Sequence, residues 1–112
     1  MPSFPQNSAE LNTILKNTKC VILKFSASWC GPCQNKDFLN EYHALKDEFI
    51  GNTEVLFLEL DVDDDEELVN EFNITSVPTF KIFNSGKLLS EYTGAGNFEK
   101  MFIDIITITD DL

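Results

Sequence analysis

Two cysteines, Cys30 and Cys33, stand three positions apart in the stretch "SASWCGPCQ" (26–34). Cysteines at this spacing can hold a metal ion, form a structural disulfide, or cycle between a dithiol and a disulfide. A structural zinc site needs about four ligands, whereas the chain has only one further cysteine and a single histidine, both distant in sequence. A structural disulfide that closes so short a loop would stabilise the fold little. The spacing therefore favours a reactive dithiol and no bound metal.

The sequence around the pair predicts where these two thiols lie. The segment "CVILKFSA" (20–27) is apolar and rich in β-branched residues, which is typical of a strand buried on both faces. From Pro32 the apolar residues recur with helical spacing, so we expect a long helix to begin there. The free N–H groups and dipole of a helix start would stabilise a thiolate at Cys30. We expect Cys30 near the exposed end and Cys33 deeper.

The remaining segments predict an α/β fold. Apolar spacing predicts a helix over 8–16, with Asn7 and Glu10 as a cap, and a strand over 54–62. Further along we expect a helix over 63–72, strands over 79–83 and 87–93 joined by a turn with Gly86 at positive φ, and a last helix after Asn97. Alternating strands and helices followed by a hairpin predict a central mixed β-sheet flanked by helices on both faces. Residues 1–112 should form a single domain.

The charge and hydropathy of the chain argue against nucleic acids and membranes as partners. Eight Lys and Arg against 19 Asp and Glu give a formal charge of −11, so we expect binding to neither nucleic acid nor anionic membrane surfaces. Apolar runs are too short to span a bilayer. The first eleven residues combine neither a basic region nor an apolar stretch, so we expect no signal peptide and a cytoplasmic protein. In that reducing compartment a CxxC pair is more often catalytic or metal-binding than structural.

Other reactive side chains have simpler interpretations. Cys20 begins the first strand and is interpreted as an inert core thiol, although a regulatory role stays open. His43 lies off the apolar stripe of the long helix and should be a surface residue. Asp61, Asp63 and Asp65 have the spacing of a calcium loop, but the positions that need glycine and the final glutamate carry Glu and Phe. We interpret that run as a solvated loop and helix start.

Four motifs together carry a resemblance to a known family. They are "WCGPC" (29–33) after a strand, "VPTF" (77–80), "NSGK" (84–87) and "YTGAG" (92–96). Their types and spacing make the chain resemble the thioredoxin family over most of its length. The resemblance implies the thioredoxin fold and a protein-disulfide reductase that uses a redox-active disulfide, Cys30–Cys33, without a cofactor.

The same resemblance implies a set of supporting residues. In this family the proline that matches Pro78 follows a cis peptide bond and packs against the dithiol. The residue that matches Val77 then offers its backbone to an extended substrate. Other positions match the apolar surface around the nucleophile: Trp29, Gly31, Pro32, Gly94 and Ala95.

One departure from the family pattern concerns Lys24. Thioredoxins usually carry a buried Asp six residues before the first motif cysteine, and here that position is Lys24. We expect Lys24 beneath Cys33, where it would support the active site. Its stem could carry the ammonium out to solvent, or the head group could stay buried and influence the thiols.

The predicted function is reduction of protein disulfides, with thioredoxin reductase as the implied electron donor and the protein acting as a monomer. Two alternatives stay open. One is an interaction module that uses the same fold as a docking surface. The other is an oxidase or isomerase, because Lys24 replaces the usual Asp.

Overall fold

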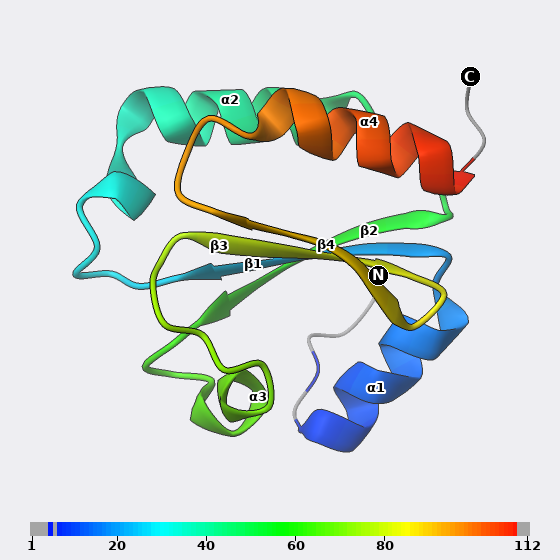
Figure 1. The fold of residues 1–112 in the computed structure, drawn as a ribbon, viewed down its shortest axis with the longest axis horizontal. Coiled ribbons are helices and arrows are strands. Elements are labelled where there is room, and N and C mark those ends of the chain that lie inside the picture. Colours follow the sequence, from blue (N-terminus) through cyan, green and yellow to red (C-terminus); the bar gives the residue numbers. More distant parts are fainter. Residues whose placement is uncertain (1–4, 6, 110–112) are drawn as a thin grey trace.

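The computed structural model describes residue 5 and residues 7–109, and there a four-stranded sheet lies between helices on its two faces (Figure 1). The strands are β1 (Cys20–Ser26), β2 (Val55–Asp61), β3 (Thr79–Asn84) and β4 (Lys87–Thr93). The helices are α1 (Ser8–Asn17), α2 (Lys36–Asp47), α3 (Glu66–Asn70) and α4 (Phe98–Thr109), with a 3₁₀ turn, η1 (Pro32–Gln34), before α2. The prediction of an α/β fold with helices on both faces of a mixed sheet is confirmed.

Strand β1 is central, because the strand order is β2-β1-β3-β4. It runs parallel to β2 and antiparallel to β3, while β3 and β4 form the predicted hairpin. All seven residues of β1 are buried, as its apolar sequence predicted. Because side chains alternate along a strand, Ile22 joins the cluster under α2 and α4, and Leu23 joins the cluster against α1 and α3.

Two hydrophobic cores therefore lie on opposite faces of the sheet (Figure 1). The core under α2 and α4 contains Cys20, Ile22, Phe38, Tyr42, Leu45, Phe49, Phe80, Ile82, Met101, Ile105 and Ile108. The core against α1 and α3 contains Leu11, Leu15, Val21, Leu23, Phe25, Leu58, Leu60, Leu68, Val69 and Phe83. Burial on both faces fixes β1, and with it the loop that follows β1.

Local signals explain most element boundaries. The side chain of Asn7 accepts a hydrogen bond from the Glu10 amide at 2.9 Å, so the predicted cap of α1 is confirmed. Gly86 has a φ of +91°, as the hairpin turn required. Helix α3 covers only 66–70 of the predicted 63–72, because carboxylates of the acidic run hold the preceding backbone in turns. Among the described residues, no helix has the length and apolar character needed to cross a bilayer.

Candidate active site

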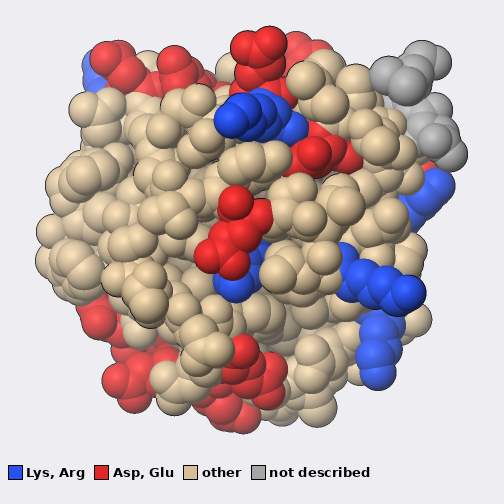
Figure 2. Space-filling model, in the orientation of Figure 1, with Lys and Arg blue, Asp and Glu red and all other residues tan. Residues whose placement is uncertain are grey.

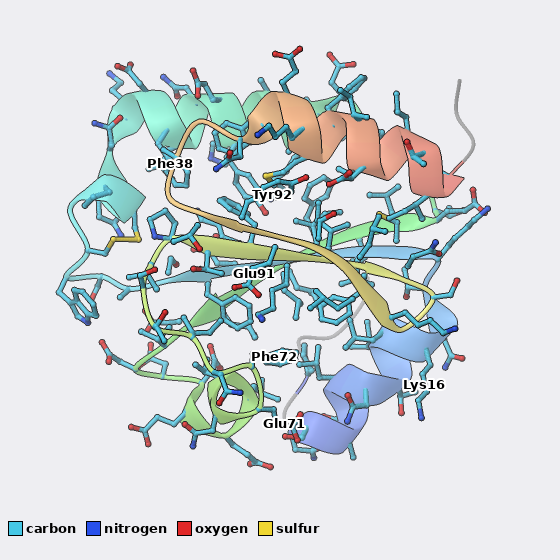
Figure 3. The ribbon with its side chains drawn as sticks, in the orientation of Figure 1. Lys16, Phe38, Glu71, Phe72, Glu91 and Tyr92 are labelled. Carbon is cyan, nitrogen blue, oxygen red and sulfur yellow. A yellow bond between two sulfur atoms is a disulfide. The ribbon has the colours of Figure 1, made fainter. Side chains whose placement is uncertain are left out.

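Cys30 and Cys33 are joined by a disulfide in the segment that follows β1, with Cα atoms 5.2 Å apart (Figure 3). The helix predicted to begin at Pro32 is interrupted there. Residues 32–34 form only the 3₁₀ turn η1, Asn35 is extended (φ −60°, ψ 129°), and α2 begins at Lys36. The side chain of Asn35 accepts a hydrogen bond from the Phe38 amide at 3.1 Å, which caps the new helix.

This break changes the expected electrostatics of the nucleophile. The dithiol precedes α2 by a short turn, so the dipole of the long helix does not begin at the cysteines. The nearest donor is local: the Cys33 amide nitrogen lies 3.2 Å from Cys30 Sγ and donates toward it. After reduction the same N–H would face a thiolate at Cys30. The stabilisation expected from a helix start is thus supplied by one amide of the η1 turn.

Both sulfurs lie in a small apolar cluster formed by Ala27, Cys30 and Cys33 with Val62 and Val77 packed against it. Cys30 keeps 4% of its surface exposed and Cys33 keeps 1%, so their order of depth agrees with the expectation, by a small margin. Exclusion of water strengthens electrostatic interactions at the reacting sulfur.

The Val77–Pro78 peptide bond is cis, which confirms the prediction. The Val77 carbonyl oxygen lies 3.5 Å from Cys30 Sγ. The backbone that the family resemblance predicts to bind substrate therefore lies next to the Cys30 sulfur. The Gly94 amide donates to the Pro78 carbonyl at 2.8 Å, and Gly94 has a φ of +85°. The loop of Gly94 is thereby fastened to the strand that begins after Pro78.

The indole of Trp29 is 67% exposed beside the disulfide. Its Nε1 donates a 2.7 Å hydrogen bond to Asp63 Oδ2. Asp63 lies in the acidic run that the sequence predicted to be merely solvated, so this positioning contact was missed. The Asp61 carboxylate in turn accepts from the Asp63 amide at 2.8 Å and fixes that loop. Nothing in the local spacing of 61–65 indicated a partner 34 positions away.

Two cavities border the disulfide on its two sides. One, of about 250 Å³, is lined by Trp29, Val62, Val69, Ile74, Thr75, Ser76 and Val77. The other, of about 600 Å³, is lined by Gly31, Pro32, Asn35, Asp37, Phe38, Glu41, Ala95 and Gly96. The residues predicted to surround the nucleophile therefore divide between the two cavities. Trp29 and Val77 line the smaller cavity, and Gly31, Pro32 and Ala95 line the larger one.

Lys24 is 2% exposed, so of the two alternatives the buried head group is confirmed and the ammonium that reaches solvent is wrong. The Lys24 Nζ lies 3.4 Å from Glu59 Oε1, and it sits over the rings of Tyr42 (4.7 Å) and Phe38 (5.2 Å). Glu59 faces Lys24 across the β1–β2 register, and its other oxygen accepts from Ser26 Oγ at 3.0 Å. The amino group is stabilised by one carboxylate and two aromatic faces.

The Lys24–Glu59 pair lies on the α2 side of β1 and affects its neighbours. Burial raises the pKa of the Tyr42 phenol, and the nearby Glu59 carboxylate raises that pKa further. Tyr42 therefore stays protonated beside the ammonium at neutral pH. The Lys24 Nζ lies against Phe38, Tyr42 and Glu59, and its position beneath Cys33 stays a prediction.

The other candidate residues behave as interpreted from the sequence. Cys20 is fully buried, and burial raises the pKa of its thiol to about 12, with a smaller contribution from the Asp104 carboxylate. A thiol with that pKa is a poor nucleophile at neutral pH. His43 is exposed on α2.

Comparisons with known proteins agree with this geometry. Residues 3–107 match the family model described as Thioredoxin. Curated relatives include thioredoxin of Geodia cydonium, 37% identical over 99 residues that cover 87% of this chain and 89% of the relative. Thioredoxin of Homo sapiens is 40% identical over 84 residues, or 74% of this chain and 73% of that one.

Solved structures show the same likeness in three dimensions. Oxidised thioredoxin from Plasmodium falciparum superposes with a TM-score of 0.71 at 30% identity, covering 87% of this chain and 90% of that one. Thioredoxin from Trypanosoma brucei brucei gives 0.78 at 27% identity, covering 95% and 88%. In both comparisons the similarity covers most of this chain.

Proposed function

The chain belongs to the thioredoxin family, and from that premise we propose distinct roles for the two cysteines and the groove beside them. The protein is a thiol–disulfide oxidoreductase of the protein-disulfide reductase type. The observation that carries the assignment of roles is the position of Cys30 Sγ between the Cys33 amide and the Val77 carbonyl.

In the proposed reaction the reduced enzyme starts with a Cys30 thiolate. Its Sγ attacks one sulfur of a substrate disulfide, a mixed disulfide forms, and the other substrate sulfur leaves as a thiolate that takes up a proton. Cys33 then loses its proton and attacks Cys30 Sγ. The Cys30–Cys33 disulfide forms and the second substrate thiol is released, so two electrons pass from the dithiol to the substrate.

Recognition of the substrate would use the surface on either side of Cys30. An extended substrate segment can pair with the backbone of Val77, because the Val77 carbonyl oxygen lies 3.5 Å from Cys30 Sγ. The exposed Trp29 indole would supply apolar contact on the same side. Gly31, Pro32 and Ala95 would supply it on the other.

The cellular setting is part of the proposal. A thioredoxin reductase would return the disulfide to the dithiol, which places the protein in electron transport and redox homeostasis. We propose that it acts as a monomer in the cytoplasm, where a reducing environment would keep Cys20 as a thiol.

Trapping of mixed disulfides tests the roles of the two cysteines. Cys33→Ser should accumulate disulfide-linked complexes with insulin chains, because Cys33 is no longer there to attack Cys30 Sγ in the mixed disulfide. Cys30→Ser should capture none. Cys20→Ser is the matched control, since it removes a thiol but keeps the pair, and it should reduce insulin like the wild type.

The outcome is read by non-reducing electrophoresis and by insulin turbidity. Capture by Cys30→Ser instead of Cys33→Ser would reverse the assignment. Insulin reduction that survives loss of both cysteines would overturn the proposed chemistry altogether.

A further inference from the structure

The larger cavity beside the disulfide continues into a groove between α2 and α4. A third cavity, of about 520 Å³, shares Glu41 and Gly96 with it. Its lining is completed by Ala44, Leu45, Glu48, Phe98, Glu99 and Phe102. We call the two joined cavities the α2–α4 groove. It leads from Gly31 and Pro32, at the dithiol, along the side of α2.

The floor of the α2–α4 groove is apolar. Phe38 is buried at its base, and Phe98 and Phe102 are half-buried along it. The rings of Phe38 and Phe98 are in contact, with centroids 5.5 Å apart. Half-exposed aromatic faces next to a reactive centre are suited to bind apolar side chains of a partner.

The rim of the groove is acidic. Asp37 and Glu41 stand four residues apart on α2, so they project on the same side of the helix, and Glu48 and Glu99 continue the rim. Every charged residue that lines the groove is a carboxylate. On the Trp29 side the cavity lining itself is uncharged, and the Asp63 carboxylate lies next to it, 2.7 Å from Trp29 Nε1. The carboxylates of the α2–α4 groove therefore surround its apolar floor.

The surface around the disulfide end is bordered by acidic side chains (Figure 2). Figure 2 shows a broad uncharged area at the end of the molecule where Figure 3 draws the disulfide, with acidic side chains above and below it. A substrate segment that enters the α2–α4 groove would meet carboxylates beside the uncharged area.

We propose that the α2–α4 groove selects disulfide substrates whose segment beside the cysteine carries apolar side chains together with Lys or Arg. The inference rests on the proposed function and adds a substrate class to it. The apolar side chains would pack on Phe38, Phe98 and Phe102, and the cations would face Asp37 and Glu41. Such charges raise the rate of encounter and disfavour acidic segments.

Two synthetic disulfide peptides test the proposal. They share the same apolar residues, and one carries two Lys next to the cysteine where the other carries two Glu. The wild type should reduce the Lys peptide with a kcat/KM about three- to tenfold higher, since each exposed charge pair contributes modestly. The preference should shrink as salt rises, because exposed charges are screened.

Charge variants assign that preference to the groove. Asp37→Asn/Glu41→Gln should lose most of it, and Glu41→Lys alone should lower or reverse it. The matched control Asp47→Asn/Glu71→Gln changes the net charge by the same amount at exposed sites outside the groove, and it should keep the wild-type preference.

The possible results distinguish failure of the groove inference from failure of the proposed function. Equal kcat/KM for the two peptides, or a preference that Asp37→Asn/Glu41→Gln retains, overturns the groove inference. Loss of the preference in the Asp47→Asn/Glu71→Gln control would assign it to net charge and also overturns it. A wild-type protein that reduces neither of the two peptides nor insulin would refute the proposed function instead. Circular dichroism of each variant verifies that a lost preference does not come from unfolding.

Discussion

Substitution of Glu59 by glutamine removes the carboxylate that faces the Lys24 ammonium but keeps the size of the side chain. Lys24 is 2% exposed, so its charge has almost no access to water, whereas the Glu59 side chain is 56% exposed. The two partners should therefore respond unequally to mutation. Glu59→Gln leaves a buried charge without its counterion, and Lys24→Met leaves a carboxylate that water can solvate.

The separation of the pair gives the magnitude. At 3.4 Å, two unit charges attract by about 1 kcal/mol in bulk water and about 5 kcal/mol at an effective dielectric constant of 20. The exposure of Glu59 and the two aromatic faces over Lys24 keep the net effect near the low end. We expect Glu59→Gln to lower the free energy of unfolding by about 1–2 kcal/mol. That corresponds to a fall of about 5–10 °C in Tm for a domain of this size.

Lys24→Met should cost less than about 1 kcal/mol, because Met keeps the apolar contact with Phe38 and Tyr42. Urea unfolding of both single variants and of the double variant measures the coupling between the two positions. The double variant should be no less stable than Glu59→Gln. A Glu59→Gln protein within about 0.5 kcal/mol of the wild type, or one more stable than Lys24→Met, would refute the reasoning.

Three further predictions concern single side chains. Lys24→Asp should make the reduction potential more negative, because a positive charge that favours the dithiol's thiolate is replaced by a negative one; equilibration with glutathione measures this, and coincident curves would contradict it. Because burial raises the pKa of Cys20 to about 12 from an ordinary value of 9, the folded state keeps a proton that the unfolded state loses. Stability should thus be complete below about pH 9 and fall toward pH 12 more steeply than in Cys20→Ala, as pH-dependent urea unfolding would detect, and parallel curves would contradict this. Asn35→Ala should destabilise the protein by about 1 kcal/mol through loss of the α2 cap; an unchanged urea midpoint would be evidence against it.

Periodicity in the sequence determined the fold class. The apolar run of β1, the alternation of helices and strands, and the turn with Gly86 all report local preferences that the tertiary structure keeps. The reactive pair was equally accessible to prediction, since its chemistry depends on two residues three positions apart. The cis bond before Pro78 was predicted through the family resemblance, because X–Pro bonds as a class are mostly trans.

The start of α2 was not predicted, because two local signals compete there. Pro32 suits a first helical turn, and Asn35 suits a cap. In the tertiary structure Asn35 is extended, so α2 begins after the dithiol. The amide of Cys33, in place of the N–H groups of a helix start, donates toward Cys30 Sγ.

Contacts between distant residues were decided only by the tertiary structure. The β1–β2 register brings Glu59 opposite Lys24, and that pairing determines that the ammonium stays buried. The acidic loop returns Asp63 to the Trp29 indole, and the packing of α4 against α2 forms the carboxylate-rimmed groove. A sequence pattern reports the preferences of neighbours along the chain, whereas the partner of a buried charge is set by which strands pair and in which register.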